Sequence, residues 1–349
     1  MKRKYDPDFS QLLKVLRCEK PDRPVLFEYF MNGDLFTYLT GKNYALAIEG
    51  DEQVKIIIEA FINAGYDYVT VPARYFGDLK FQTATHDTKA TTSQNEGFLI
   101  TNRATFEAYP WPDPERGDFG LFDRLQSYLK PGMKFIVPGP GGLLENVINL
   151  TGFENLCFMF FEDEELVKDI FDSVGSRLLR FYEKYSQIEL VGALIVNDDW
   201  GFKTQTMFDP DTLRQYVFPW HKKMVEAIHH ESKPAILHSC GNLAAIMDDI
   251  IDDLKYDAKH SYEDAILPVE QAYEKWGNRI AILGGIDIDF LVRRNPQEIT
   301  ERAKALLVQT SCKGYALGSG NSIPPYIPVE NYMAMIQSFD DPKVVPLNN

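Results

Sequence analysis

A histidine and a cysteine stand two residues apart at the end of one apolar run, PAILHSCG. Residues two apart on a strand point to the same side, so His238 and Cys240 are predicted to project together. Imidazole nitrogen and thiolate are zinc ligands, and a catalytic zinc site has three protein ligands and one open position. The alternative is a hydrogen-bonded core histidine beside an inert cysteine. Four residues at other strand ends are candidates for the third ligand, although serine is a poor one: Asp199, Asp287, Glu263 and Ser319.

Acidic and imidazole side chains end two other apolar runs. In VNDDW, Asn197 and Asp199 are predicted to point the same way. Asp198 and Asp199 are candidates to coordinate a cation, to orient His238 or to hold a polar substrate, and the alternative for one of them is to cap the following turn. His260 in AKHSYED is a candidate general acid or base, because imidazole titrates near neutral pH. Its alternative is a hydrogen bond to a neighbouring loop.

Polar residues recur at one strand end after another, although burying an unpaired polar side chain costs about 1–3 kcal/mol. In a barrel of parallel strands, the C-terminal ends carry the active site. The predicted catalytic residues are therefore Asp199, His260 and Arg74. The predicted substrate-binding residues are Glu28, Asn197, Asp198, Glu263, Asp287 and Asn321. The predicted metal ligands are His238, Cys240 and Ser319.

Eight short segments, rich in β-branched and aromatic residues, position these side chains. Amphipathic helical stretches lie between most of them, and such alternation implies a parallel sheet with right-handed crossovers. No glycine-rich dinucleotide fingerprint follows the first segment, so we predict an α/β fold of the (β/α)8 TIM-barrel type rather than an open doubly wound sheet. The eight predicted strands are 23–30, 66–72, 134–140, 192–198, 234–241, 256–263, 279–287 and 314–321. The predicted helices include 52–65, 162–187, 209–232, 242–254 and 295–311.

The stretch 74–114 departs from this alternation, because it is polar and Thr-rich and then alternates. It is predicted to be a hairpin-like insertion after the second strand that forms a lid or a rim. The chain shows no internal repeat, low-complexity tract or Pro-rich linker, so residues 1–349 are predicted to form a single domain.

Charge and composition exclude several classes of function. The formal net charge of −15 offers no basic field for nucleic acid or an anionic membrane surface. The N-terminus lacks the apolar stretch of a signal peptide, and no run is long enough to cross a membrane. The four cysteines have no disulfide-framework spacing. These features predict a cytoplasmic protein that acts on a small molecule.

Several ordered motifs then carry a family resemblance. The segments NDDWGFKTQTMFDPDTLRQYVFPWHKKMVEAIH, HSCGNLAAIMDDII, GGIDIDFL and GSGNSIPPYIPVENYMAM resemble the uroporphyrinogen decarboxylase superfamily. Within it, they are most similar to the branch of corrinoid (cobalamin)-dependent methyltransferases. The resemblance covers roughly residues 190–337 and is faint before them. It implies a (β/α)8 barrel, in agreement with the pattern of segments.

The methyltransferase branch implies zinc held by a His-x-Cys pair and a later cysteine. His238 and Cys240 match the pair, whereas Ser319 in GSGN stands where the later cysteine is expected. The branch also implies methyl transfer between a small methylated compound or thiol and a corrinoid on a partner protein. No corrinoid-binding domain is visible in this chain, so the corrinoid protein is predicted to be a separate partner.

The decarboxylase branch implies a different reading. Its arginine-rich N-terminal segment binds porphyrinogen carboxylates, but the corresponding stretch RPVLFEYFMNGDLFTYL has Glu28 and no arginine after Arg23. The family's aspartate after the second strand aligns roughly with Arg74. Uroporphyrinogen decarboxylation, a lyase reaction of porphyrin and heme biosynthesis, is therefore the alternative function. A third hypothesis is a non-catalytic barrel that binds a small molecule or corrinoid. The aromatic run CFMFF is a candidate homodimer contact.

Overall fold

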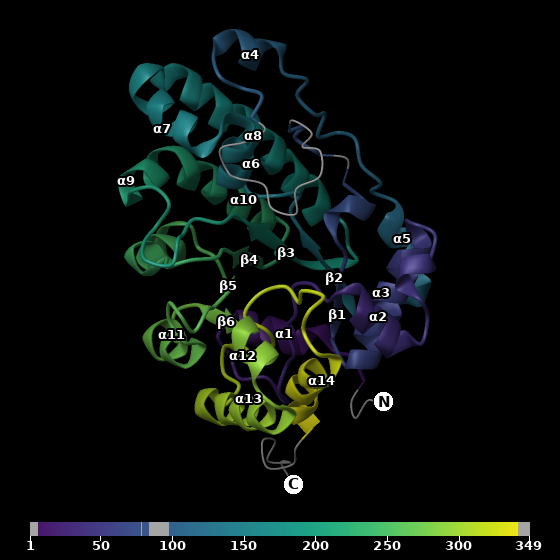
Figure 1. Ribbon diagram of the computed structural model, residues 1–349. Helices are drawn as coiled ribbons and strands as arrows, with labels where there is room; N and C mark the ends of the chain where they lie inside the picture. The colour runs from purple at the N-terminus through teal and green to yellow at the C-terminus, as the bar shows by residue number, and fades with distance from the viewer. Residues whose placement is uncertain (1–5, 78, 84–97, 341–349) are drawn as a thin grey trace.

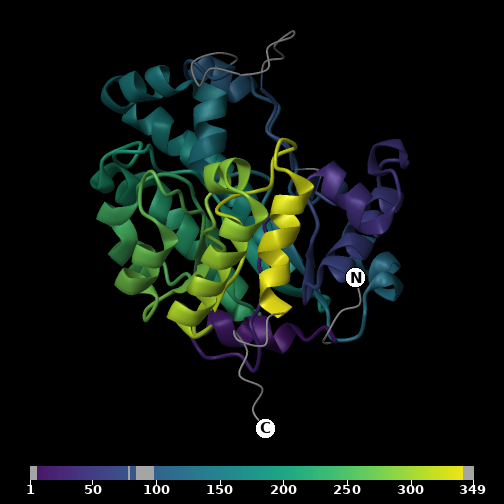
Figure 2. The ribbon, with the colours of Figure 1, turned by 60° about the horizontal axis from the view of Figure 1, so that its bottom comes forward.

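A curled parallel sheet forms the centre of the molecule, and helices cover its outer side (Figures 1 and 2). The computed structural model describes residues 6–77, 79–83 and 98–340. The sheet has seven strands in chain order, and each pairs in parallel with the next. The strands are β1 (Tyr68–Thr70), β2 (Lys134–Pro138), β3 (Val191–Asn197), β4 (Ala235–His238), β5 (Ala258–His260), β6 (Ala281–Leu283) and β7 (Tyr315–Ala316). This α/β architecture is consistent with a TIM-like barrel.

The strands are almost wholly buried, as expected of a parallel sheet covered by helices. The longer helices lie before, between and after the strands, with three before β1 and three between β2 and β3. They are α1 (Phe9–Leu16), α2 (Gly33–Thr40), α3 (Asp51–Ala64), α6 (Leu143–Thr151), α7 (Phe153–Glu162), α8 (Glu164–Ser186), α10 (Phe218–His230), α11 (Val269–Trp276), α13 (Pro296–Thr310) and α14 (Val329–Gln337). Shorter helices are α4 (Arg103–Ala108), α5 (Leu121–Leu125), α9 (Pro210–Thr212) and α12 (Ile288–Arg293).

The predicted count of eight strands is not confirmed. The first predicted segment, 23–30, forms an isolated parallel bridge between Leu26 and Leu317 in place of a strand. Pro24 has no N–H to donate to a ladder, and the N–H of Glu28 donates to the Tyr68 hydroxyl at 2.6 Å. This segment therefore lies beside β7 and contacts β1 through a side chain.

Four of the predicted helices are confirmed within a few residues. Asp209 and Asn295 accept hydrogen bonds from the first turns of α9 and α13, each followed by proline, as their sequence predicts. The helix predicted over 242–254 is also present: residues 244–253 are continuously helical, with a 3-10 turn at Ala244–Ile246 and a π-helical turn at Asp249–Asp253.

The 74–114 stretch is described in part, and residues 78 and 84–97 lie outside the described residues. The described part contains a short turn at Ala73–Tyr75 and helix α4. An antiparallel bridge joins Gly77 to Gly117. The predicted hairpin is not confirmed. α4 lies near α7 and α8 (Figure 1).

None of the helices that the structure describes has the length and apolar character needed to cross a bilayer.

A buried ion pair joins the segment before the Leu26 bridge to the start of β1. Arg23 donates to both carboxylate oxygens of Asp67, at 3.0 and 2.6 Å, and both side chains are buried. The same carboxylate accepts the Asp8 N–H at 2.9 Å. Because the pair is bidentate and dry, it fixes the N-terminal segment against the sheet.

The Asp67→Asn variant should lower the free energy of unfolding by about 3–5 kcal/mol, because it leaves the Arg23 charge buried without its partner. Denaturant unfolding followed by circular dichroism measures this. The control is Asp289→Asn, whose partner Arg293 is 74% exposed, and we expect a change below about 0.5 kcal/mol there. Equal losses in the two variants would contradict the structural role of the buried pair.

Candidate metal centre

The ends of β3 and β4 are held side by side by their register and by a backbone contact. Asn197 pairs with His238, and the Asp198 N–H donates to the His238 carbonyl at 3.0 Å. Beyond the strands, a Cβ on Gly241 would lie 2.1 Å from the carbonyl carbon of Gly201, and the φ of Gly241 is +87°. Only glycine fits this approach and this conformation. The loops that follow β3 and β4 therefore run against each other.

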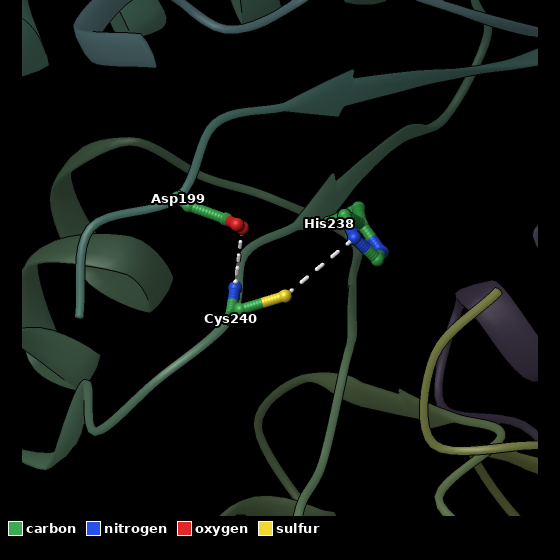
Figure 3. A group of neighbouring side chains, drawn as sticks. All are labelled: Asp199, His238 and Cys240. Carbon is green, nitrogen blue, oxygen red and sulfur yellow. Dashed lines mark hydrogen bonds between the residues drawn. The ribbon is translucent and has the colours of Figure 1, made fainter. Parts of the chain in front are cut away.

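This arrangement brings Asp199, His238 and Cys240 together. Their ligand atoms all lie within 4.8 Å of one another, and within the described residues this is the one group of its kind (Figure 3). The Cys240 N–H donates to Asp199 Oδ1 at 2.8 Å, and Cys240 Sγ lies 3.9 Å from His238 Nε2. The nitrogen and sulfur ligands of a tetrahedral zinc ion lie about 3.5 Å apart, given its usual bond lengths. The three residues therefore fit a zinc ion with small movements.

Two hydrogen bonds determine which nitrogen of His238 carries its proton. His260 Nε2 lies 3.1 Å from the Ser319 carbonyl, which can only accept, so this nitrogen carries hydrogen. Burial lowers the pKa of His260 to about 3, so the ring is neutral and its Nδ1 accepts. His238 Nδ1 lies 2.8 Å from that atom and must donate. Burial, then the neighbouring His260, holds the pKa of His238 well below its usual range. His238 Nε2 is therefore left with a free lone pair on the side of Cys240.

The Cys240 thiol lies in a polar but enclosed environment. The Ser261 hydroxyl and the Asn321 amide each lie 3.4 Å from Sγ. Burial and the neighbouring charge of Asp199 raise the pKa of Cys240 to about 12. In the metal-free protein the thiol keeps its proton, and a bound cation supplies the charge that would remove it.

Ser319, the predicted third ligand, makes its hydrogen bonds within the protein. Its hydroxyl donates to Glu28 Oε1 at 2.6 Å and also contacts the Asn321 carbonyl. Both Ser319 and Glu28 are fully buried, and burial raises the pKa of Glu28 to about 8. The oxygen donor beside His238 and Cys240 is that of Asp199, one of the alternatives raised by the sequence.

Asp198, one of the predicted substrate-binding residues, makes structural hydrogen bonds. It is fully buried, and its carboxylate accepts the backbone N–H groups of Leu144 and Glu145 at 2.9 and 3.0 Å. It also accepts Trp200 Nε1–H at 2.8 Å and lies 3.0 Å from His221 Nε2. Two of these four partners lie at the start of α6, and together the four engage most of the hydrogen-bonding capacity of the carboxylate.

His260, the predicted general acid or base, has partners on both ring nitrogens. It is fully buried, and one nitrogen faces His238 while the other faces the Ser319 carbonyl. The second contact is the hydrogen bond to a neighbouring loop that the sequence offered as the alternative.

Two residues that the sequence did not single out complete the site. The Tyr29 ring stacks on His238 with centroids 4.2 Å apart. Glu145 bonds the Gly142 N–H at 2.9 Å, and its pKa is raised to about 8 by burial and by Asp198 and Asp199. The signal for Glu145 was available in the sequence: the glycine-rich end of the β2 run, PGPGG, is followed at once by LLEN.

A cavity of about 1150 Å³ opens at the ends of β5, β6 and β7. Glu263, Asp287 and Asn321 line it, and Asn321 also contacts Cys240, so the cavity adjoins the group of Asp199, His238 and Cys240. The carboxylate of Asp287 is partly engaged, since it accepts the N–H groups of Asp264 and Phe290 at 2.8 and 3.1 Å. Glu263 and Asn321 are thus the better placed of the predicted substrate-binding residues.

Two further predicted residues lie apart from this cavity. Arg74 is exposed beyond the end of β1, and its guanidinium donates to the hydroxyls of Tyr44 and Tyr75, both at 3.0 Å. The structure does not bring it into contact with His238 or Cys240. Asn197 lies at the end of β3, and its Oδ1 is buried without a hydrogen-bond partner in the described part of the chain.

Comparison with known proteins agrees with the fold. The model of the uroporphyrinogen decarboxylase (URO-D) family matches residues 136–341, more than half of the chain. A methyltransferase from Methanosarcina mazei is 16% identical, with a TM-score of 0.70 over 95% of this chain and 97% of that one. A vitamin-B12-independent methionine synthase candidate from Listeria monocytogenes is 14% identical, with a TM-score of 0.47 over 91% and 98%. A search of curated proteins found no match.

In metal-free protein, Cys240 should react slowly with iodoacetamide, because only the thiolate is nucleophilic. A pKa of about 12 leaves about a thousandfold less thiolate at pH 8 than an ordinary cysteine has. The alkylation rate should rise about tenfold per pH unit until the pH reaches that pKa. Peptide mapping by mass spectrometry measures the rate, with the less buried Cys157 as the internal comparison. Alkylation of Cys240 as fast as that of Cys157 at pH 8 would argue against this environment.

Proposed function

Because the chain belongs to the uroporphyrinogen decarboxylase family, we propose that it is a methyltransferase-like enzyme of that family. It moves a methyl group between a small methylated compound or thiol and a corrinoid carried by a partner protein. A zinc ion is bound by His238, Cys240 and Asp199. The observation that carries this proposal is the convergence of one imidazole nitrogen, one sulfur and one carboxylate beside a cavity.

The three ligands suit a divalent cation in type and charge. Cysteine sulfur, imidazole nitrogen and carboxylate oxygen are the usual zinc donors, and three protein ligands leave one position open for a substrate. A thiolate and a carboxylate together balance the two charges of the cation. When bound, zinc would supply Lewis-acid chemistry, lowering the pKa of a substrate thiol or polarising an ether oxygen.

The protein's own groups have distinct tasks in this proposal. His238 presents an unprotonated nitrogen, and its ring is held between Tyr29 and His260. Asp199 accepts the Cys240 N–H, which keeps the carboxylate next to the sulfur. The Asn321 amide faces the sulfur from the cavity side and can bond a polar group of the substrate. These contacts orient the reacting groups and limit their motion.

Exposed aromatic side chains near the site support a protein partner. Phe202 is 41% exposed in the loop after β3, and its carbonyl accepts the Asn242 N–H just beyond Cys240. Its ring lies 6.1 Å from that of Phe153 at the start of α7. Further along α7, Phe158 and Phe161 are 63% and 92% exposed. Such apolar groups beside a site favour an interface, and we assign it to the corrinoid protein. A homodimer through α7 is the competing use of Phe158 and Phe161.

Uroporphyrinogen decarboxylation fits the cavity less well. A substrate with many carboxylates needs arginines that are free to bind it. Here Glu263, Asp264, Asp287 and Asp289 line the cavity. Its arginines already face carboxylates, Arg293 that of Asp289 at 2.6 Å and Arg294 that of Glu298 at 3.4 Å.

Metal analysis of protein purified without chelators or a histidine tag should give close to one zinc per chain. His238→Ala and Cys240→Ala should each lower the affinity by more than about 100-fold, since even residues that only orient ligands contribute 10–100-fold. Asp199→Asn should also weaken binding, whereas Ser319→Ala should retain it. Absence of zinc from the wild type, or its retention in His238→Ala, would sink the metal proposal.

Methyl transfer to free cob(I)alamin, followed by its absorbance change, should be seen with at least one donor from a panel of methylated thiols, ethers and amines. The His238→Ala variant should lose this activity. Conversion of uroporphyrinogen III would instead establish the decarboxylase alternative. Ligand binding that survives His238→Ala, with no turnover in either assay, would establish a non-catalytic barrel.

A further inference from the structure

We infer that three consecutive residues at the end of β5, Lys259, His260 and Ser261, orient the ligand atoms that β4 presents to the metal. They are positioning residues that bind His238 and Cys240 or the backbone beside them. The inference rests on the proposed zinc site and goes beyond it, because it states how the two ligands acquire their orientation and proton state before any metal arrives.

His260 acts on His238. The two residues are partners in the β4–β5 register, and their Nδ1 atoms lie 2.8 Å apart. The Ser319 carbonyl fixes the hydrogen of His260 on Nε2, so His260 can only accept the His238 hydrogen on Nδ1. The atom left bare on His238 is Nε2, the atom that faces Cys240. If a donor stood in place of the Ser319 carbonyl, His260 would carry its hydrogen on Nδ1 and donate it to His238. The hydrogen of His238 would then lie on Nε2, the nitrogen that the proposal assigns to the metal.

Lys259 acts on the backbone around Cys240. Its side chain is 4% exposed, and its Nζ donates to the carbonyls of Ser239 and Ser261 at 3.3 and 2.6 Å. The ammonium also lies 4.4 Å from the centre of the Tyr262 ring. Ser239 immediately precedes Cys240, so one buried cation ties the ligand loop of β4 to the end of β5.

Ser261 acts on the sulfur itself. Its hydroxyl donates to Cys240 Sγ at 3.4 Å. Its φ is +85°, a conformation that costs a residue with a side chain about 1–3 kcal/mol and persists only where the surroundings impose it. The Lys259 bond to the Ser261 carbonyl is part of that surrounding. The strained backbone thus turns the hydroxyl toward the sulfur.

The three contacts form one unit. Successive residues of a strand point to opposite faces, so His260 lies on the same side of the sheet as His238. Lys259 points to the other side, where its ammonium reaches the carbonyls of Ser239 and Ser261. Residues that hold ligand side chains in this way commonly contribute 10–100-fold to metal affinity. No such contact is made to Asp199 by Lys259, His260 or Ser261 among the described hydrogen bonds, so Asp199 is the ligand they leave unconstrained.

The first test needs no metal. Nitrogen-15 NMR of the imidazoles in metal-free wild-type protein should show His238 protonated on Nδ1 and bare on Nε2. His260→Leu removes the acceptor and should allow a population protonated on Nε2, whereas His260→Asn, whose amide oxygen replaces Nδ1, should keep the wild-type form. A wild-type His238 protonated on Nε2 would overturn the inference at once.

The second test measures zinc affinity by competition with a chelator. We expect His260→Leu to weaken binding by about 10–100-fold, and His260→Asn to restore most of the loss. Lys259→Met should also weaken binding, and the matched control His229→Gln, at the far end of α10, should not.

Wild-type protein that binds no zinc refutes the proposed function, while the NMR result still decides the proton positions. Tight zinc in both His260→Leu and Lys259→Met refutes the inference and leaves the zinc site standing. If His260→Leu does not fold, Lys259→Met and the wild-type spectrum decide.

Discussion

The parallel register of β3, β4 and β5 is the constraint on which the site depends. Asn197 is opposite His238, and His238 is opposite His260. These three residues therefore form one row across the ends of β3, β4 and β5. Because side chains alternate along a strand, a shift of one residue in this register would turn His238 and Cys240 to the other face of the sheet. The hydrogen bond between the two histidines would disappear with it. The pairing of the three strands therefore determines which side chains meet at the site.

Several titratable groups around the site are held neutral, although the chain as a whole has a net charge of −15. His238 and His260 are held neutral by burial, and the raised pKa values of Glu28 and Glu145 leave both carboxyls largely protonated at neutral pH. Cys240 retains its proton for the same reason. A cation entering this place would meet a neutral imidazole, a thiol that can release its proton and the carboxylate of Asp199.

Much of the fold was predictable from the sequence, because strand ends and helix starts carry local signals. Seven predicted strands contain β1 to β7 or overlap them, and Asp209 and Asn295 begin their helices as predicted. The first predicted strand does not form, because pairing depends on partners that the local pattern does not show. Pro24 has no N–H for a ladder, and the Glu28 N–H donates to the Tyr68 hydroxyl instead of to a neighbouring strand. The helix predicted over 242–254 forms over residues 244–253, but the amphipathic pattern does not show that its turns are of the 3-10 and π types.

The site was predictable where two residues lie on one strand and less so where they meet across space. Strand alternation was enough to propose His238 and Cys240 as a pair, and Asp199 was one of several acids that sequence could not rank. Asp198 is adjacent to Asp199, yet its carboxylate accepts backbone N–H groups from the start of α6, more than 50 residues away in the sequence. Tyr29 and Lys259 carry no sequence signal of a site, since a tyrosine and a lysine in a strand are ordinary residues.

The contact between Gly201 and Gly241 has a consequence for how such a protein can change. Where two backbones touch, a side chain on either glycine would displace the other loop, and the loops follow directly on Asp199 and Cys240. The β3–β4 side is thus closed to variation. The cavity lies on the other side, over the ends of β5 to β7, where its walls are side chains and loops. Substitutions in that wall can change the shape of the cavity without moving Asp199, His238 and Cys240.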